Sequence, residues 1–310
     1  MGELLRAATR RLRKSGSETA RLDAELLLAH VLRADRVTLM SAPEVRVNST
    51  AAAAFDGFVA RRERGEPVAY IRGRKEFYGL VFTVDPRALI PRPETELLVE
   101  LGLARLRHLL VSQPRPPNAE PLLVWDVGTG SGAIAVALAV ECRRRGYADD
   151  VRIRATDVSR DALALATENA VVHDVVDRIE FAVANLTAAV DMTDQDGGAT
   201  DWLDNRPADL LVANLPYIPS GVVPTLPVAA SFEPLRALDG GVDGLETIRR
   251  LIGELPDALT PSGIALLEIG DGQAAALRDA VSSAHVDWDV AVHPDLVGRE
   301  RVFEMRRGGG

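Results

Sequence analysis

A strand-to-helix turn near the middle of the chain reads Leu122-Leu123-Val124-Trp125-Asp126-Val127-Gly128-Thr129-Gly130-Ser131-Gly132. Residues 122–127 are an apolar run that is typical of a buried β-strand, and glycines follow at three alternate positions. Such glycines let the backbone turn tightly and approach a ligand with no Cβ in the way. Residues 132–145 then predict a helix, whose free N–H groups at its start can bind an anion.

Outward from this turn, strand-like runs alternate with helix-like segments. Strands are expected at 151–156, 179–183, 209–213, 263–269, 286–292 and 301–305, and helices at 94–111, 159–170, 245–259 and 273–284. This alternation predicts an α/β fold in which a mostly parallel sheet carries helices on both faces. Ligands of such sheets bind beyond the carboxyl ends of the strands, near the switch in strand order, so we expect the chemistry there.

The first 75 residues follow a different pattern, because helical periodicity is present and a strand pattern is not. Leu22, Leu26 and Ala29 fall on one helical stripe, and Ser49 is a candidate cap for a helix that ends near Gly65. We therefore expect a small helical domain. Apolar residues among turn formers at 76–91 then indicate a β-hairpin or an extended linker.

The charge of the chain is unevenly distributed. The net charge is −9 at pH 7, with +6 on residues 1–75 and −15 on residues 76–310. This acidic majority argues against non-specific binding of nucleic acid by the whole chain. The single cysteine, Cys142, excludes an internal disulfide framework and a Cys-rich metal site. We expect a cytoplasmic protein, because the sequence contains no apolar run of 18 residues and no signal-peptide core.

No pattern of metal ligands is evident in the sequence. The five histidines are scattered along the chain. An acidic stretch, Asp191–Asp204, lacks the ordered spacing of a calcium-binding loop and is expected to be a mobile loop. No metal is therefore expected.

Two cofactors fit the glycine loop. Gly128-x-Gly130-x-x-Ala133 satisfies a permissive dinucleotide pattern, whereas Asp126-x-Gly128-x-Gly130-x-Gly132 matches that of S-adenosylmethionine-dependent methyltransferases. In the methyltransferase interpretation Asp126 helps hold the cofactor's ammonium group. Asp157, at the end of the next strand, is placed to accept hydrogen bonds from ribose hydroxyls. The same turn can also form without a ligand.

A second motif, Asn214-Leu215-Pro216-Tyr217, follows the strand expected at 209–213 and resembles the Asn-Pro-Pro-Tyr motif of methyltransferases that act on planar nitrogens. The lone pair of such a nitrogen is delocalised, so the enzyme has to hold the –NH₂ group in place. The Asn214 side-chain oxygen and the Leu215 carbonyl can accept its two N–H bonds. Pro216 stiffens the turn and Tyr217 can pack on the planar group. The alternative is a turn after a buried strand, with Tyr217 in the core.

Longer segments resemble the release factor glutamine methyltransferase family, which modifies the glutamine of the Gly-Gly-Gln motif in class I peptide chain release factors. The resemblance spans roughly residues 3–306 and is carried by Arg64-Gly65-Glu66-Pro67-Val68-Ala69-Tyr70-Ile71, Phe77-Tyr78-Gly79-Leu80, Leu89-Ile90-Pro91-Arg92-Pro93-Glu94-Thr95-Glu96, the glycine loop, Phe232-Glu233-Pro234, Ala237-Leu238-Asp239-Gly240-Gly241-Val242-Asp243-Gly244-Leu245 and Leu267-Glu268-Ile269-Gly270.

The resemblance implies three parts: a helical N-terminal substrate-recognition domain at 1–75, a β-hairpin linker at 76–92 and a Rossmann-like methyltransferase domain at 93–310. It implies that S-adenosylmethionine contacts Asp126, Gly128, Thr129, Gly130, Ser131, Gly132, Asp157, Asn185, Leu186 and Asn214. It implies that the substrate glutamine contacts Asn214, Leu215, Pro216, Tyr217 and Arg92, with Asn214, Pro216 and Tyr217 as the catalytic residues.

The sequence departs from the family pattern in three places. Leu215 replaces the first proline of Asn-Pro-Pro-Tyr, which should loosen the turn but keep the carbonyl. Asn185-Leu186 stands where the family often has Asp and an apolar or aromatic residue. Asn185 can still bond the adenine edge, whereas Leu186 offers weaker stacking. The Asp191–Asp204 loop is longer than the family needs. Glu268 ends a strand at the ligand-facing edge and is left without a role.

Four alternatives remain beside this resemblance. A glutamine methyltransferase of a ribosomal protein would use identical chemistry. An adenine-N6 methyltransferase of nucleic acid would have to extract a base from its stack and usually brings a basic groove. A nicotinamide-dependent dehydrogenase would explain the glycine loop but leave the Asn214 motif unused. A non-catalytic binding module of the translation apparatus would have no need of Asn214.

Overall fold

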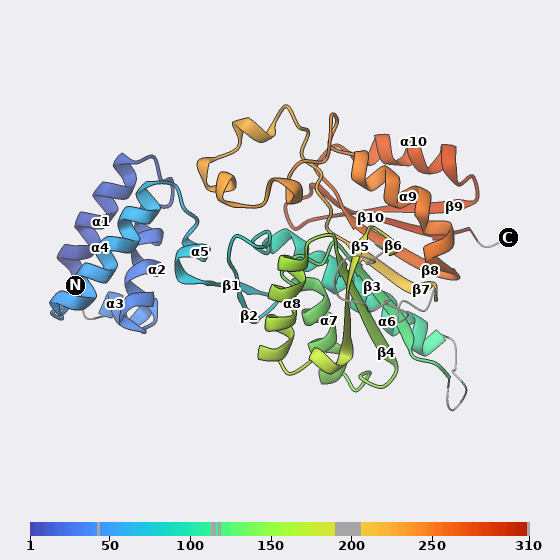
Figure 1. Ribbon diagram of the computed structural model, residues 1–310, viewed down its shortest axis with the longest axis horizontal. Helices are drawn as coiled ribbons and strands as arrows, with labels where there is room; N and C mark the ends of the chain where they lie inside the picture. Colours follow the sequence, from blue (N-terminus) through green and yellow to red (C-terminus); the bar gives the residue numbers. More distant parts are fainter. Residues whose placement is uncertain (42–43, 113–115, 117–118, 190–205, 309–310) are drawn as a thin grey trace, which may run out of the picture.

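A computed structural model of the chain describes residues 1–41, 44–112, 116, 119–189 and 206–308. The expected loop Asp191–Asp204 lies outside the described residues. The described part consists of a helical bundle at the N-terminal end and a sheet that is covered by helices (Figure 1).

Eight strands of the described residues form one sheet in the order β6-β5-β4-β3-β7-β8-β10-β9. They are β3 (Leu122–Val127), β4 (Val151–Asp157), β5 (Ile179–Asn185), β6 (Ala188–Ala189), β7 (Ala208–Ala213), β8 (Leu259–Glu268), β9 (Trp288–Pro294) and β10 (Glu300–Arg307). β3, β4, β5, β7 and β8 are parallel, whereas β10 is antiparallel to β8 and β9. The order switches between β3 and β7, because the chain moves outward through β4 and β5 and returns on the other side. The Rossmann-like α/β fold is therefore confirmed.

Two layers of helices cover the sheet (Figure 1). One face carries α6 (Glu96–Ser112), α7 (Ala133–Arg144) and α8 (Arg160–Val172), and the other carries α9 (Glu246–Ala258) and α10 (Ala274–Ala284). Successive residues of β3 point to opposite faces, as a pleated strand requires. Val124 thus joins the core with α7, and Trp125 joins the core with α9. These elements match the expected ones to within about four residues at each end.

Five short helices precede the sheet: α1 (Gly2–Lys14), α2 (Ala20–Leu32), α3 (Arg36–Ser41), α4 (Ser49–Glu63) and α5 (Val68–Arg72). They share a separate core that includes Leu12, Leu27 and Phe55. Two local expectations are wrong. The cap of α4 is Asn48, whose side chain accepts a hydrogen bond from Ala51 N at 2.8 Å. The buried stripe of α2 runs through Leu27 and Leu28 rather than Leu22, which is exposed, because α2 packs between α1 and α4.

A β-hairpin joins the helices to the sheet and confirms the hairpin expectation. β1 (Arg74–Phe77) pairs antiparallel with β2 (Leu80–Thr83). The two turn residues, Tyr78 and Gly79, both have positive φ, at 50° and 69°, which suits a two-residue hairpin turn. Phe77 and Phe82 are buried in the core formed by α6 and α7. The hairpin is therefore packed onto the sheet part of the molecule.

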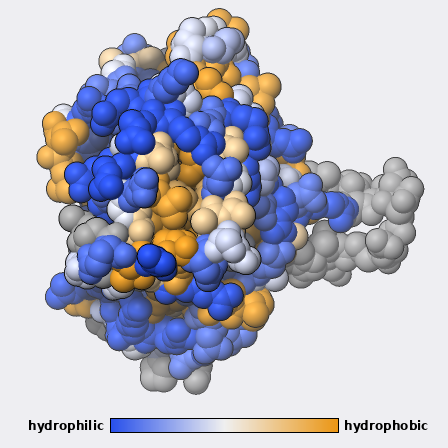
Figure 2. All heavy atoms as spheres, turned by 90° about the vertical axis from the view of Figure 1, so that its left-hand side faces the viewer, coloured by the Kyte–Doolittle hydropathy of each residue, from blue (hydrophilic) through white to orange (hydrophobic). Residues whose placement is uncertain are grey.

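An irregular segment, residues 214–245, follows β7 and arches from the sheet toward the N-terminal helices (Figure 1). It contains short 3-10 helices at Val223–Thr225, Val228–Phe232 and Leu235–Ala237. The segment reaches the turn before α5, because a Cβ built on Gly65 would lie 2.5 Å from Val228 Cγ1. On the N-terminal side, hydrophilic residues surround a strip of hydrophobic ones (Figure 2). Among the described residues, no helix is both long and apolar enough to cross a membrane.

Candidate active site

The glycine loop leaves the carboxyl end of β3 at the switch in strand order. The N–H groups of Gly128 and Thr129 both donate to the Thr156 carbonyl of β4, each at 2.8 Å. Gly128, Gly130 and Gly132 have φ of 74°, 55° and 78°, a region that other residues adopt only under strain. The alternate glycines of the sequence are thus explained by one repeated backbone conformation.

Asp126 of β3 is hydrogen-bonded to the glycine loop and to the start of α7. Its Oδ2 accepts hydrogen bonds from Thr129 Oγ1 at 2.7 Å and from Ala135 N at 3.2 Å. Its other oxygen, Oδ1, is buried and has no hydrogen-bond partner among the described residues. Burial raises the pKa of Asp126 to about 7. An orphaned, fully buried carboxylate oxygen fits a cationic donor, and the ammonium group of S-adenosylmethionine is such a donor.

Close packing explains why two of the three glycines cannot be replaced by a residue with a side chain. A Cβ on Gly128 would lie 2.9 Å from Leu215 Cδ2, and one on Gly132 would lie 3.0 Å from the Cβ of Ala166 in α8. Leu215 belongs to the second predicted motif, which follows β7. Because β3 and β7 are neighbours, with Val127 opposite Ala213, the two motifs meet at one edge of the sheet.

Asp157 ends β4 beside the loop. Its Oδ2 accepts from Gly130 N at 2.9 Å and its Oδ1 accepts from Ser159 N at 2.8 Å. Burial raises the pKa of this carboxyl above its ordinary value. Each oxygen keeps a second lone pair, so the predicted bonds to ribose hydroxyls are compatible with both contacts. The ribose contact itself stays a prediction.

Asn185 and Leu186 differ in their surroundings. Asn185 is exposed at the end of β5, and its Oδ1 accepts from Arg250 Nη2 at 3.3 Å. Leu186 is buried in the core that contains Leu215, with a positive φ of 59°. Their predicted contacts with the adenine group stay predictions.

Asn214 follows β7 and bonds a residue that the sequence analysis did not assign. Its Nδ2 donates to the Thr95 hydroxyl at 3.0 Å. The side-chain oxygen of Asn214 receives no hydrogen bond from the described residues. It is therefore available to accept an N–H bond of a substrate, which is the role expected from the motif.

The hydroxyl and the backbone carbonyl of Tyr217 are both hydrogen-bonded. Its hydroxyl donates to Glu268 Oε1 at 3.2 Å, and its carbonyl accepts from Gln273 Nε2 at 2.9 Å. Burial, together with the nearby Glu268 carboxyl, raises the pKa of Tyr217 to about 12. Tyr217 is therefore a neutral phenol at physiological pH and is unsuited to act as a base.

Arg92 forms part of a clamp. Its Nη2 donates to Glu233 Oε1 at 2.6 Å, while Glu233 Oε2 accepts from Ile90 N at 3.1 Å. Glu233 is buried and Arg92 is partly exposed. The clamp ties the irregular segment to the chain that leads into α6. The predicted contact of Arg92 with substrate stays a prediction.

Sequence reasoning missed the residues behind the motif, Thr95, Glu268, Glu233 and Gln273. Each lies in or beside a segment that carried the family resemblance. That resemblance could have pointed to them, whereas no spacing of residue types could. In the described part of the chain, no group of three or more histidine, cysteine or carboxylate side chains is placed to hold a metal ion.

The fold and this site define a Rossmann-like, S-adenosylmethionine-dependent methyltransferase. Comparison with known proteins narrows the class. Residues 3–73 match the family described as the PrmC N-terminal domain. The chain is 37% identical to the release factor glutamine methyltransferase of Moorella thermoacetica, over 97% of this chain and 96% of that protein. It is 39% identical to the enzyme of the same name from Neisseria gonorrhoeae, over 92% of this chain and 93% of that protein.

A solved structure supports the fold alone. The human METTL16 catalytic domain, solved with an RNA hairpin, is 15% identical, with a TM-score of 0.53 over 88% of this chain and 92% of that chain. The near-full-length relatives decide the family. This chain belongs to the release factor glutamine methyltransferase family.

Proposed function

We propose that this chain methylates the side-chain amide nitrogen, N5, of the glutamine in the Gly-Gly-Gln motif of class I peptide chain release factors, and so supports translation termination. Family membership supports the reaction class. The observation that carries the proposal is the orientation of Asn214 beside the glycine loop, with its amide nitrogen bonded to Thr95 and its oxygen available.

Residues of the glycine loop would hold the cofactor. S-adenosylmethionine, when bound, supplies an electrophilic methyl group on a sulfonium centre. Asp126 Oδ1 would take its ammonium group, and Asp157 would take its ribose. The backbone at Gly130 leaves room for close approach, because a Cβ there would meet only Ala88, at 3.9 Å.

The Asn214 motif would hold the substrate amide. Asn214 Oδ1 and the Leu215 carbonyl accept its two N–H bonds, which fixes the plane of the –NH₂ group. Pro216 stiffens the turn between these two acceptors and Tyr217. Tyr217 stays protonated and packs against the planar amide. The site needs no base before attack, because methylation itself makes the nitrogen acidic.

We also propose the division into a recognition domain at 1–75, a hairpin linker at 76–92 and a methyltransferase domain at 93–310. The separate core of the helices and the pairing of β1 with β2 support this division. The charge of −15 on residues 76–310 supports a protein substrate over a nucleic acid. Because release factors act on ribosomes, we place the enzyme in the cytoplasm.

The test uses purified protein and S-adenosylmethionine with a labelled methyl group. The acceptors are a class I release factor, its Gly-Gly-Gln glutamine-to-alanine variant, a ribosomal protein fraction, and unmethylated DNA and RNA. We expect label on the intact release factor alone. Label on the alanine variant, on ribosomal protein or on nucleic acid would contradict the proposed substrate.

A further inference from the structure

Two buried polar residues from distant parts of the chain meet behind the Asn214–Tyr217 motif. Thr95 ends the short 3-10 helix Pro93–Thr95 that leads into α6, and Glu268 is the last residue of β8. They are 3% and 1% exposed, respectively. Burial of a carboxyl at that depth is costly, so the contacts that Glu268 makes call for an explanation.

The Tyr217 hydroxyl is directed at the Glu268 carboxyl, and Thr95 lies beside the same carboxyl. Tyr217 Oη donates to Glu268 Oε1 at 3.2 Å. The Thr95 hydroxyl interacts with the same carboxyl and, like Tyr217, lowers its pKa. Asn214 Nδ2 in turn donates to Thr95 Oγ1 at 3.0 Å. The first residue of the catalytic motif is thus bonded to Thr95, and the last is bonded to Glu268.

The direction of these bonds follows from what each group can donate. An ionised carboxylate only accepts, and a threonine hydroxyl has one proton. If Thr95 donates that proton to Glu268, its oxygen can only accept from Asn214. Asn214 must then turn its NH₂ group toward Thr95 and its oxygen away. The reverse orientation of the amide would force Thr95 to abandon Glu268 and leave a buried acceptor short of a partner.

The charges around Glu268 are mixed. Burial is the largest influence and raises its pKa, while Thr95, Arg301 and Tyr217 lower it and Glu94 raises it. Glu268 Oε2 has no partner among the described residues. Gln273, five residues further along, fixes the carbonyl of Tyr217 at 2.9 Å and is itself held by Gly270 N at 2.8 Å. Glu268 at the end of β8 and Gln273 before α10 therefore each bond Tyr217.

We propose that Thr95 and Glu268 are positioning residues that hold the Asn214 amide with its oxygen toward the substrate nitrogen. They do not touch the reacting atoms and act through Asn214 and Tyr217. The inference rests on the proposed function and deepens it. It assigns a role to Thr95 and to Glu268, neither of which received a role from the sequence.

The test compares Thr95→Val, Thr95→Ser and Glu268→Gln with the wild-type chain in the release factor assay. Valine keeps the shape of threonine and removes the acceptor for Asn214, whereas serine keeps it. We expect Thr95→Val to lower kcat by about 10- to 100-fold, the size of a small misplacement of a reacting group. KM for S-adenosylmethionine should stay unchanged. Thr95→Ser should restore kcat to within about threefold of wild type.

A matched control comes from the same strand as Glu268. Thr260 lies at the opposite end of β8, and its hydroxyl faces Asp209 Oδ1 at 3.5 Å. Thr260→Val removes a comparable hydroxyl far from the site and should leave kcat near wild type. Thermal melting of every variant excludes loss of folding as the cause of lost turnover.

A double-mutant cycle gives a second, independent readout. Because Thr95 and Glu268 act on the same motif, the double variant Thr95→Val with Glu268→Gln should lose no more kcat than the more affected single variant. Wild-type kcat in Thr95→Val, failure of serine to restore it, or multiplying losses in the double variant would each overturn the inference. A wild-type chain that labels no release factor would instead overturn the proposed function itself, and the inference with it.

Discussion

Asn169 of α8 binds both backbone polar groups of Thr83 in β2. Thr83 N donates to Asn169 Oδ1 at 2.8 Å, and Asn169 Nδ2 donates to Thr83 O at 3.1 Å. The same Nδ2 also donates to Ser131 O in the glycine loop at 2.9 Å. One fully buried side chain therefore connects the hairpin to the predicted cofactor loop.

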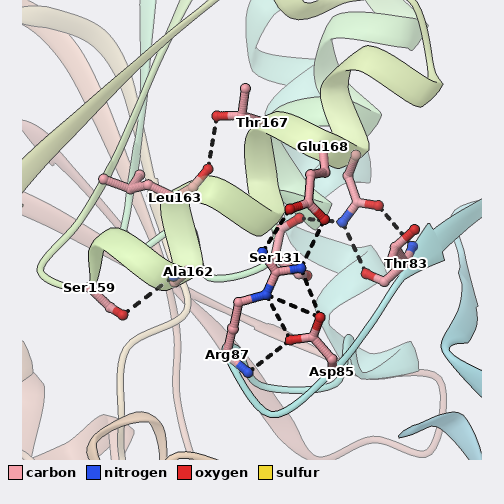
Figure 3. Close-up of polar contacts among 10 residues, drawn as sticks. Thr83, Asp85, Arg87, Ser131, Ser159, Ala162, Leu163, Thr167 and Glu168 are labelled. Carbon is pink, nitrogen blue, oxygen red and sulfur yellow. Dashed lines mark hydrogen bonds and ion pairs between the residues drawn. The ribbon is translucent and has the colours of Figure 1, made fainter. Parts of the chain in front are cut away.

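Removing this connection should weaken both parts. Asn169→Ala leaves three backbone groups without their partner, and an unsatisfied buried group costs about 1–3 kcal/mol. Because the backbone groups of the exposed Thr83 can hydrogen-bond to water instead, we expect a loss of about 2–3 kcal/mol in the free energy of unfolding. Urea unfolding measures it. The control is Thr167→Val on the same helix, where the Thr167 hydroxyl donates to Leu163 O of α8 at 2.8 Å (Figure 3). Equal stability of the two variants would contradict the role of Asn169.

The orientation of Asn214 leads to a prediction for catalysis. Asn214→Ala should lower turnover by about 10²–10³, the size seen when one preorganised polar contact is lost. Binding of S-adenosylmethionine, measured by calorimetry, should change little. Near-full turnover by this variant would remove Asn214 from the mechanism.

The buried carboxyl of Asp126 predicts a pH dependence of stability. Its pKa is raised from 3.8 to about 7 in the folded chain. Between these values the unfolded chain releases the proton while the folded chain keeps it. Stability therefore falls as the pH rises from about 4 to about 7 and levels off above. Asp126→Asn should flatten this slope in urea unfolding, and Asp149→Asn, at a side chain that is 96% exposed, should leave it unchanged. An unaltered slope in Asp126→Asn would assign the titration to another group.

The same titration should appear in cofactor binding. Once Asp126 is ionised, its unpaired Oδ1 attracts the ammonium group of S-adenosylmethionine. The dissociation constant should therefore fall as the pH rises through about 7 in the wild-type chain. Calorimetry across this range should show a weaker dependence for Asp126→Asn. Parallel curves for the two proteins would place the ammonium group elsewhere.

Variants of the clamp between Arg92 and Glu233 can separate a structural role of Arg92 from a role in substrate binding. Arg92→Ala leaves the buried Glu233 carboxylate without its charged partner, which typically costs about 3–5 kcal/mol and less here because Arg92 is partly exposed. Adding Glu233→Gln should recover part of that stability. If Arg92 also contacts substrate, KM for the release factor stays raised in the double variant. A normal KM there would assign Arg92 to the clamp alone.

Local pattern and topology made much of this structure predictable. The glycine loop and the Asn214 motif were expected at one edge of the sheet, because parallel strands have their carboxyl ends at the same edge. Glu268 was expected at the ligand-facing edge, but its bond with Tyr217 and the bond of Asn214 with Thr95 were not, since they depend on how α6, β7 and β8 pack in three dimensions. Leu22 was misplaced for a related reason: α2 contacts helices on two sides, so periodicity alone did not identify its buried face.

The central claim is that Asn214 presents a glutamine amide for methylation. The most direct measurement is mass spectrometry of the Gly-Gly-Gln peptide from a release factor incubated with S-adenosylmethionine and either the wild-type chain or Asn214→Ala. The account predicts one added methyl group on the glutamine side chain with the wild-type chain, and almost none with the variant. An unmodified peptide with the wild-type chain, or equal methylation by both proteins, would contradict it.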